Sequence, residues 1–340
     1  MTSENKYNIR SGYDMGLLDN IKANKIPTTL QGNILIYGSP KMGKTSTVYG
    51  LYKEKALFLA FERGYLFLDG VMAIDITKPS ELQKIVRELK ADGKQTFDTV
   101  VFDVADIFAK MYETYTCQLN GVDELSKIAW GGGWAKWEQE CDKILQELER
   151  CGYNLVFISH ATSKSMVKYN DDGKEVEYEK MMPTCPKRIL NLIAKRCDHI
   201  FYIDQEVENG KPVRYLYTRD CEHHMAGSRV AKLPNRILLN PEKIQEEIKN
   251  AVESEENTTD EVVKPIEIKK VDFEELKQEV VDLVMNYFHA NDRMDLVTRI
   301  TDEILGLGVK INDLTPMQVD ALEIVKIKLE EAVEENGLNK

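Results

Sequence analysis

One eight-residue segment constrains this chain more than any other. Residues 38–45 read Gly-Ser-Pro-Lys-Met-Gly-Lys-Thr, which is the spacing G-x-x-x-x-G-K-T. An apolar run, 33–37, precedes it and a helical pattern follows, as expected around a phosphate-binding loop. In such a loop the glycine backbone curls around the β-phosphate, and the positive end of the next helix faces the same anion. The segment therefore predicts a nucleoside triphosphate site.

The positions of the loop carry different roles. Lys44 is expected to reach the β- and γ-phosphates, and the hydroxyl of Thr45 to bind Mg²⁺, a hard ion that keeps most of its waters. ATP and Mg²⁺ are the cofactors that this motif predicts. The residues expected to surround the nucleotide here are Gly38, Ser39, Pro40, Lys41, Met42, Gly43, Lys44, Thr45 and Ser46.

Short apolar stretches alternate with helical patterns between about residues 33 and 219. This alternation predicts an α/β fold, in which helices cover both faces of a mostly parallel sheet. The expected strands are 33–37, 56–61, 98–103, 153–159, 199–204 and 213–218. The expected helices are 44–54, 80–91, 105–118, 134–150 and 187–196.

The pattern along the chain predicts four parts. An N-terminal extension, 1–30, precedes an ATPase core, 31–243. Residues 244–265 are polar and acidic without an apolar period, which is typical of a solvated linker. Helical periodicity returns in 266–340, where Thr315 is expected to cap a helix that has Pro316 at its first position. The sequence thus predicts a small helical module after the linker.

Charge is unevenly distributed along the chain. Residues 251–340 carry 22 acidic and 10 basic side chains, an excess that equals the whole net charge of −12. The core is therefore balanced, and the acidic total does not argue against a nucleic-acid partner for it.

The sequence also indicates where in the cell the protein is expected. The apolar runs are far shorter than the roughly 18–20 residues that span a bilayer. The first residues contain no apolar signal segment, and the six cysteines form no C-x-x-C pair. These features predict a cytoplasmic protein that does not engage a membrane.

Hydrolysis needs a carboxylate beside the metal and a group that activates water. Asp103 ends the expected strand 98–103, in the position that orients the Mg²⁺ shell in phosphate-loop enzymes. Glu62 closes the strand 56–61, which we expect beside the loop strand, and it is the candidate base. Asp106 is the alternative candidate for the base, although an acidic residue that only stabilises the start of a helix would give the same sequence pattern.

Two further groups are candidates at the sheet edge. His160, or its neighbour Ser159, ends the strand 153–159 and is placed to sense the γ-phosphate, because ligands of open α/β sheets bind at that edge. Arg229 in the turn 226–229, and Arg219 after the strand 213–218, are candidate guanidinium groups for transition-state charge. The sequence does not decide whether such an arginine acts in its own chain or in a neighbouring subunit.

The segment between residues 161 and 187 is long for a connection and contains a hairpin signal, Asn170-Asp171-Asp172-Gly173. Lysines alternate with tyrosines on either side of this turn. Cations follow a phosphate backbone and aromatic rings stack on bases, so the segment is a candidate contact for single-stranded DNA. Five carboxylates in the same segment weaken the indication of DNA binding, and a solvated hairpin is the alternative interpretation. The candidate DNA-binding residues are Lys164, Lys168, Tyr169, Lys174, Tyr178 and Lys180.

Taken together, these motifs resemble the phage-type RecA-like ATPases, which are nucleotide-binding proteins encoded beside single-strand annealing and recombination genes. The resemblance covers about residues 30–240. It is carried by the loop 38–45, by Phe61-Glu62-Arg63-Gly64-Tyr65 and Thr99-Val100-Val101-Phe102-Asp103, and by the segments Ile158-Ser159-His160 and Ala226-Gly227-Ser228-Arg229.

The resemblance implies a RecA-like core that binds ATP and Mg²⁺ and engages single-stranded DNA through loops near the γ-phosphate. It also implies a homo-oligomer, cooperation with a single-strand DNA-binding protein, and a role for Glu62 as the water-activating glutamate. The chain departs from bacterial RecA in having Lys41 and Met42 where glycines are frequent, and in its acidic tail. A small-molecule P-loop kinase and an ATP-gated assembly protein are the alternative functions.

Overall fold

The computed structural model describes residues 25–169, 173–253, 258–259 and 271–338. Its contacts divide the chain into two compact units, Met1–Ile266 and Glu267–Lys340. We call the first the ATPase unit and the second the C-terminal unit. Among the described residues, none of the helices combines the length and the apolar character that crossing a membrane requires.

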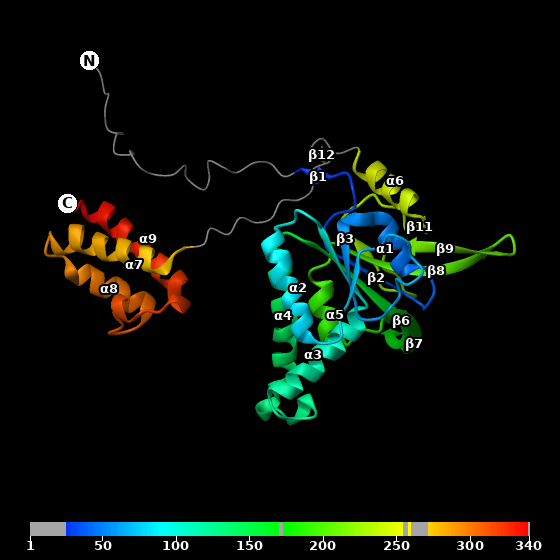
Figure 1. Cartoon of the computed structure of the whole chain (residues 1–340), viewed down its shortest axis with the longest axis horizontal. Coiled ribbons are helices and arrows are strands. Elements are labelled where there is room, and N and C mark those ends of the chain that lie inside the picture. The colour runs from blue at the N-terminus through cyan, green and yellow to red at the C-terminus, as the bar shows by residue number, and fades with distance from the viewer. Residues whose placement is uncertain (1–24, 170–172, 254–257, 260–270, 339–340) are drawn as a thin grey trace, which may run out of the picture. The chain divides into compact units, whose positions relative to one another are not determined.

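The elements of both units are named in Figure 1. The strands are β1 Ile26–Pro27, β2 Ile34–Gly38, β3 Ala56–Ala60, β4 Ala73–Asp75, β5 Thr99–Asp103, β6 Asn154–Tyr169, β7 Glu175–Pro183, β8 His199–Glu208, β9 Lys211–Tyr217, β10 Gly227–Ser228, β11 Arg236–Leu238 and β12 Thr258–Thr259. The helices are α1 Lys44–Tyr52, α2 Pro79–Asp92, α3 Ala105–Leu119, α4 Gly133–Arg150, α5 Lys187–Ala194, α6 Pro241–Val252, α7 Phe273–Leu283, α8 Met294–Leu305 and α9 Val319–Asn336. A π-helical segment, Val284–His289, extends α7, and short 3₁₀ turns lie at Lys53–Lys55, Leu125–Lys127, Ala129–Gly131, Ile311–Asp313 and Pro316–Gln318.

The main sheet has the strand order β11-β9-β8-β2-β6-β5-β3-β4. The six strands from β8 to β4 are parallel, and β9 and β11 continue the sheet antiparallel to their neighbours. The prediction of a mostly parallel α/β fold is confirmed. The expectation that the strand of Glu62 neighbours the loop strand is wrong, because β6 and β5 lie between β2 and β3.

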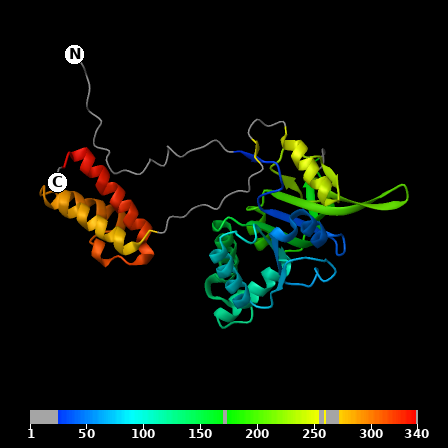
Figure 2. The same cartoon turned by 45° about the horizontal axis from the view of Figure 1, so that its top comes forward.

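Helices cover both faces of this sheet. On one face the buried side chains of α2, α3, α4 and α5 form a core with β5 and β6. On the other face α1 and α6 pack over β2, β3 and β8, as the two views in Figures 1 and 2 show. Such two-sided coverage explains why the central strands are almost continuously apolar.

Two antiparallel hairpins continue past the parallel part of the sheet. The first is formed by β6 and β7, which pair from Ala161 and Pro183 to Tyr169 and Glu175. The second is formed by β8 and β9, and it extends well beyond the neighbouring strands in Figure 2. The β6–β7 pairing begins one residue after His160, the partner of Gly38 at the end of β2, and the β8–β9 pairing begins at Tyr202, level with Tyr37.

The interpretation of residues 244–265 as a linker is wrong in its first part. Residues 241–252 form α6, whose side chains Ile244, Ile248 and Val252 are buried. The side chain of Asn240 caps this helix by accepting a hydrogen bond from the backbone N–H of Lys243. The many acidic residues of α6 face solvent, and its i, i+4, i+8 apolar positions bind it to the ATPase unit.

The C-terminal unit has its own core. Buried residues of α7, α8 and α9 pack together, with Phe288, Leu322 and Val325 fully enclosed. Thr315 forms the expected cap, because its side chain and that of Gln318 make a reciprocal capping box. Pro316 then begins the short turn that leads into α9.

Candidate nucleotide-binding site

The carboxyl ends of four parallel strands meet at one edge of the sheet. Gly38 at the end of β2 lies level with His160 on β6, and Asp103 at the end of β5 lies level with Ala60 on β3. Glu62 follows two residues after Ala60. The fold therefore brings together the loop, the candidate metal ligand and the candidate base, although they are distant in the sequence.

The local backbone geometry requires glycine at two positions of the loop. A Cβ on Gly38 would stand 2.6 Å from the carbonyl oxygen of Ile203, so only glycine lets β8 approach β2 here. Gly43 has φ 95°, a left-handed conformation, and directly precedes the first residue of α1. These positions shape the turn that a phosphate-binding loop requires.

Lys44 is held inside the loop that it closes. Its side chain is 6% exposed, and Nζ donates hydrogen bonds to the carbonyl oxygens of Gly38 at 2.9 Å and Ser39 at 3.0 Å. Burial lowers the pKa of Lys44, against the attraction of Asp103 and Glu62. A triphosphate would supply the negative charge that this buried ammonium group lacks.

Asp103 and Thr45 form the candidate magnesium site. The hydroxyl of Thr45 donates a hydrogen bond to Oδ2 of Asp103 at 3.0 Å. Oδ1 of Asp103 is buried and has no hydrogen-bond partner among the described residues. Burial raises the pKa of Asp103 to about 6. An unsatisfied buried carboxylate oxygen beside a hydroxyl is the donor set that Mg²⁺ prefers, so these residues fit the ion.

Space for the ion and the phosphates is present. The cavity over the loop has a volume of about 560 Å³, and it is lined by loop residues together with Glu62, Asp103 and His160. A Cβ on Gly64 would stand 3.3 Å from both Oδ2 of Asp103 and Oγ1 of Thr45. A side chain at residue 64 would therefore fill part of the space beside the metal ligands.

Glu62 and Lys44 are joined through one imidazole ring. Nδ1 of His160 lies 3.5 Å from Nζ of Lys44, and Nε2 of His160 lies 3.6 Å from a carboxylate oxygen of Glu62. The ammonium group only donates, so Nδ1 accepts and the neutral ring carries its hydrogen on Nε2, facing Glu62. This arrangement connects the phosphate-binding lysine to the candidate base.

Asp106, the rival base, is occupied by other contacts. Its Oδ1 accepts from the hydroxyl of Ser159 at 2.6 Å. Its Oδ2 accepts from the backbone N–H of His160 at 3.1 Å and from the hydroxyl of Thr184 at 2.6 Å. The carboxylate therefore fixes the base of the β6–β7 hairpin, and the structure favours Glu62 as the group that faces the cavity.

The structure separates Arg229 from the phosphate cavity. Its guanidinium pairs with Asp198 at 3.1 Å, before the start of β8 and therefore at the amino edge of the sheet. Arg229 cannot reach the nucleotide of its own chain, and its action on a neighbouring subunit stays a prediction. Arg219 is likewise engaged, because its guanidinium donates to the carbonyl oxygens of Ser228, Val230 and Ala231.

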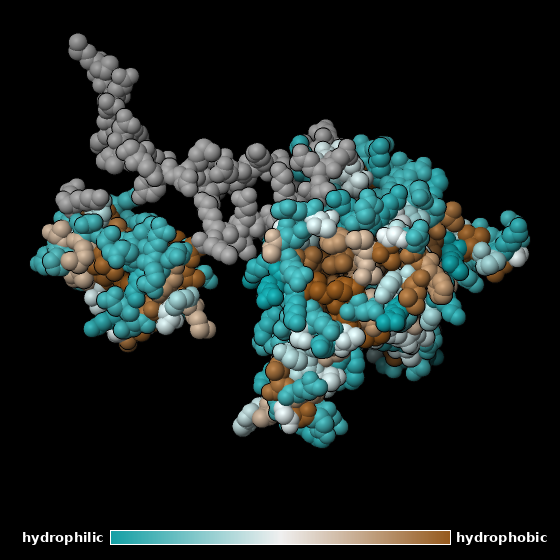
Figure 3. Space-filling model, in the orientation of Figure 1, coloured by the Kyte–Doolittle hydropathy of each residue, from teal (hydrophilic) through white to brown (hydrophobic). Residues whose placement is uncertain are grey.

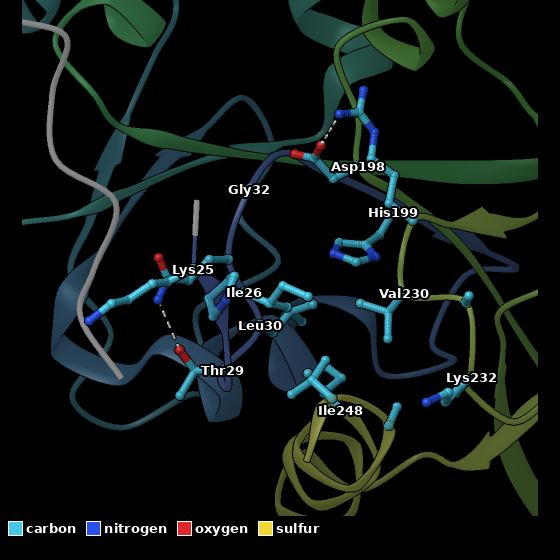
Figure 4. A pocket seen from close by; sticks show the side chains of 16 residues that line it. Lys25, Ile26, Thr29, Leu30, Gly32, Asp198, His199, Val230, Lys232 and Ile248 are labelled. Carbon is cyan, nitrogen blue, oxygen red and sulfur yellow. Dashed lines mark hydrogen bonds and ion pairs between the residues drawn. The ribbon is translucent and has the colours of Figure 1, made fainter. Parts of the chain in front are cut away.

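Figure 4 shows the surroundings of Asp198 and His199, where a second cavity of about 530 Å³ opens at the amino edge. Leu30, Val230 and Ile248 provide much of its wall. It contains no phosphate-binding loop, although Arg229 lines it. The first cavity combines a buried lysine, a hydroxyl and two carboxylates, which is the chemistry expected of a nucleotide site.

Three residues that line the phosphate cavity were not predicted from the sequence. Phe67, which is 98% exposed, and Leu68 lie in the segment between β3 and β4. Apolar residues are also visible on the surface of the ATPase unit in Figure 3. Arg214 on β9 also lines the cavity. None of these belongs to a motif, so only the fold could bring them to the site.

Alternation along the β6–β7 hairpin separates its charges onto two faces. Lys164 lies opposite Lys180, and the ammonium group of Lys168 lies 5.7 Å from the ring centroid of Tyr178 on the same face. We call this the basic face. Glu175, Glu177, Glu179 and Tyr169 take the alternate positions, and Tyr169 donates to Glu175 at 2.8 Å. Lys174 directly precedes β7, and residues 170–172 of the expected turn lie outside the described residues.

An acidic loop contacts the basic face. Asp220 accepts from Lys180 at 2.9 Å, and Glu222 accepts from Lys168 at 2.7 Å. Just after this segment, the backbone N–H of Met181 on β7 donates to the carbonyl oxygen of His223 at 2.8 Å, and the N–H of Met225 donates to the carbonyl oxygen of Met181 at 3.2 Å. Two of the candidate DNA-binding lysines are therefore engaged with residues 220–222, which we call the acidic loop.

Comparison with known proteins places the chain in a family. A family described as an AAA domain matches residues 31–230, which is more than half of the chain. An SPbeta prophage-derived uncharacterized protein, YorG of Bacillus subtilis (strain 168), is 26% identical over 322 residues that cover 90% of this chain and 95% of that protein. A solved structure, that of the KaiC-like protein PH0186 from Pyrococcus horikoshii OT3, is 14% identical, covers 65% of this chain and 98% of its own, and gives a TM-score of 0.36. The matched region includes the phosphate-binding loop and most of the largely parallel sheet, and the chain belongs to the AAA domain family.

Proposed function

We propose that this protein binds and hydrolyses ATP with Mg²⁺, and that single-stranded DNA on the β6–β7 hairpin stimulates the reaction during phage recombination, annealing or replication. It works as a homo-oligomer, together with a single-strand DNA-binding protein. The observation that carries the proposal is the continuity of β6, which runs from the sheet core past His160 into the hairpin without a break.

Two sets of contacts support a coupling between nucleotide and hairpin. His160 lies between Lys44 and Glu62 and is the last residue of β6 before pairing with β7 begins at Ala161. On β2, next to the loop, the hydroxyl of Tyr37 donates to the carbonyl oxygen of Met181 on β7 at 3.0 Å. A shift at the cavity is thereby felt on both strands of the hairpin.

The chemistry of the cavity supports hydrolysis. The loop and Lys44 would hold the phosphates, and Thr45 and Asp103 would hold a magnesium ion, which would supply positive charge to neutralise the phosphates. Glu62 is placed to accept a proton from an attacking water. Its contact with His160 ties the base to the strand that continues into the hairpin, so DNA on the hairpin can change the position of Glu62.

The basic face supports the choice of DNA as partner. Lysines follow a phosphate backbone, and Tyr178 on the same face offers a ring to a base. Three of the five carboxylates that weaken the sequence signal, Glu175, Glu177 and Glu179, lie on the opposite face by strand alternation, and the other two lie outside the described residues.

The test compares ATP turnover with and without a saturating oligonucleotide. We expect turnover to rise with the wild-type protein and the rise to be much smaller in Lys164→Glu. Lys84→Glu is the matched control, because it makes the same charge change at an exposed position of α2 and should respond like the wild type. Turnover that is unchanged by DNA would contradict the proposal and favour an ATP-gated assembly protein. Phosphorylation of a small molecule would favour a kinase.

A further inference from the structure

Arg214 reaches the phosphate cavity from a strand that carries no motif. It lies in the middle of β9, opposite Gln205 on β8, and Gln205 stands two residues beyond Ile203, the partner of Gly38. The β8–β9 hairpin thus carries Arg214 past the carboxyl edge of the sheet. The backbone carbonyl of Arg214 accepts from the N–H of Leu239 at 2.9 Å, which fixes the strand at this point.

The guanidinium of Arg214 points to one particular side of the loop. Its Nη1 would lie 3.5 Å from a Cβ built on Gly43, and Oγ of Ser46 lies 3.4 Å from the same point. The metal ligands Asp103 and Thr45 are instead the neighbours of Gly64. Arg214 therefore approaches the loop at Gly43 and Ser46, and the carboxylates line the side of Gly64.

Arg214 also lacks a protein partner in the described part of the chain. Arg236, on the adjacent strand β11, pairs with Glu206, and Arg229 pairs with Asp198. No hydrogen bond or ion pair joins the guanidinium of Arg214 to a described residue, although it lines a cavity that already contains Lys44 and Lys41. The two carboxylates of the cavity, Glu62 and Asp103, do not pair with Arg214, so its charge is available to an anionic ligand.

We propose that Arg214 binds the nucleotide of its own chain, at the α- and β-phosphates. The backbone N–H groups of a phosphate-binding loop hold those two phosphates, and Gly43 is the loop residue that Arg214 faces. A guanidinium presents a planar fork of donors that matches phosphate oxygens. Arg214 thus provides, within the same chain, a guanidinium for the α- and β-phosphates, which is a different role from the transition-state contact predicted for Arg229 or Arg219. This inference rests on the proposed nucleotide site.

The test measures the affinity for ATP and for ADP. Arg214→Ala should weaken both by about ten- to a hundredfold, the range expected for loss of a charged hydrogen bond, because both ligands carry the phosphates concerned. Arg214→Lys should recover part of the loss. Arg236→Ala is the matched control, since it removes a guanidinium that lies outside the cavity, and it should leave both affinities unchanged.

The outcomes separate this inference from the proposed function. Thermal unfolding without nucleotide should show that Arg214→Ala is folded. If the wild type fails to bind ATP, the nucleotide site itself is wrong. If the wild type binds ATP and Arg214→Ala binds both nucleotides equally well, only the role of Arg214 is refuted. A loss confined to ATP would place the guanidinium at the γ-phosphate and contradict the assignment to the α- and β-phosphates.

Mixing two defective proteins tests whether Arg214 acts within its own chain. Lys44→Ala subunits retain Arg214 but have a defective loop, whereas Arg214→Ala subunits have the opposite defect. If the arginine serves its own chain, the mixture should hydrolyse no more ATP than the separate proteins, at ATP concentrations near the wild-type KM. Recovered turnover would show that Arg214 serves a neighbouring subunit.

Discussion

Lys44 and Asp103 are ionisable residues whose side chains are buried in the cavity over the loop. Burial lowers the pKa of Lys44 and raises that of Asp103 to about 6, so the cavity disfavours the charged form of each. A triphosphate removes this penalty for the lysine, and a divalent cation removes it for the carboxylate. The residues of the site are therefore arranged for a ligand that carries both signs of charge.

Glu62→Gln should separate binding from hydrolysis. The amide keeps an oxygen that can accept from Nε2 of His160, but it cannot accept a proton from water. We expect ATP affinity close to that of the wild type and turnover lower by at least about a hundredfold, the usual contribution of a general base. Binding by fluorescence and steady-state hydrolysis measure the two effects.

Lys44→Ala is the reference for Glu62→Gln, because it should lose ATP binding itself. Near-normal turnover of Glu62→Gln would remove Glu62 from the role of base. Asp106, the other candidate, would first have to give up its contacts with Ser159, His160 and Thr184.

His199 should make stability depend on pH between about 4 and 6.5. Burial lowers its pKa to about 4, partly opposed by Asp198 and reinforced by Arg229 and Arg219. The unfolded chain therefore binds a proton that the folded chain does not, and stability falls as the pH drops from 6.5 to 4. At 1.36 kcal/mol per pKa unit, this loss is about 3 kcal/mol.

Chemical denaturation across this pH range measures the effect. His199→Gln should show a shallower slope, while carboxylates that titrate in both proteins provide the common background. Equal slopes in the two proteins would mean that His199 does not contribute.

At the scale of elements, sequence and structure agree where the pattern is local. The six expected strands and five expected helices of the ATPase unit are all present, because the core strands are short continuous apolar runs and helices such as α2 and α4 repeat buried residues at helical spacing. The helix α6 was missed because its acidic residues hid the spacing of Ile244, Ile248 and Val252, although Asn240 and Pro241 form a start signal. The strand order and the position of Arg214 beside the loop depend on pairing between segments that are distant in the sequence. No local sequence pattern indicates such pairing.

The acidic loop and the basic face give a prediction at this scale. Changing Asp220 to Asn together with Glu222 to Gln releases Lys180 and Lys168 from their carboxylate partners. Single-stranded DNA should then bind more tightly, by about tenfold at low salt, because two more cations are available to phosphates. Titration with a labelled oligonucleotide at several salt concentrations measures the change.

The matched control for the acidic loop is Asp123→Asn with Glu124→Gln. It removes the same charge from the connection between α3 and α4 and should leave affinity nearly unchanged. Equal gains in both variants would show that net charge, and not release of the basic face, explains the effect.

At the scale of the whole molecule, catalytic and acidic parts are separate. Every residue of the candidate nucleotide site lies in the ATPase unit, whereas the C-terminal unit, residues 267–340, carries 17 acidic and 9 basic side chains, a net charge of −8 out of the total of −12. The C-terminal unit has a core of its own, so it does not need the ATPase unit to bury its apolar residues.

A protein that ends at Ile266 should therefore retain ATP turnover without DNA, within about twofold of the full chain. It should also bind single-stranded DNA more tightly at low salt, and the gain should fade at about 0.15 M salt, where the Debye length is about 8 Å. Turnover and oligonucleotide binding at two ionic strengths test both statements. A folded but inactive truncated protein would show that the C-terminal unit contributes to the site.

The length of β6 has a mechanical consequence. A flexible connection takes up a displacement of one end by changing its backbone torsion angles. A strand that is hydrogen-bonded along its length instead tilts as one rigid element. Residues 161–169 extend about 30 Å at about 3.3 Å per residue. A tilt of about 10° at His160 would then move the far end by about 5 Å, which is comparable to the spacing between neighbouring strands. The loss of one phosphate could in this way become a step large enough to shift a bound polymer.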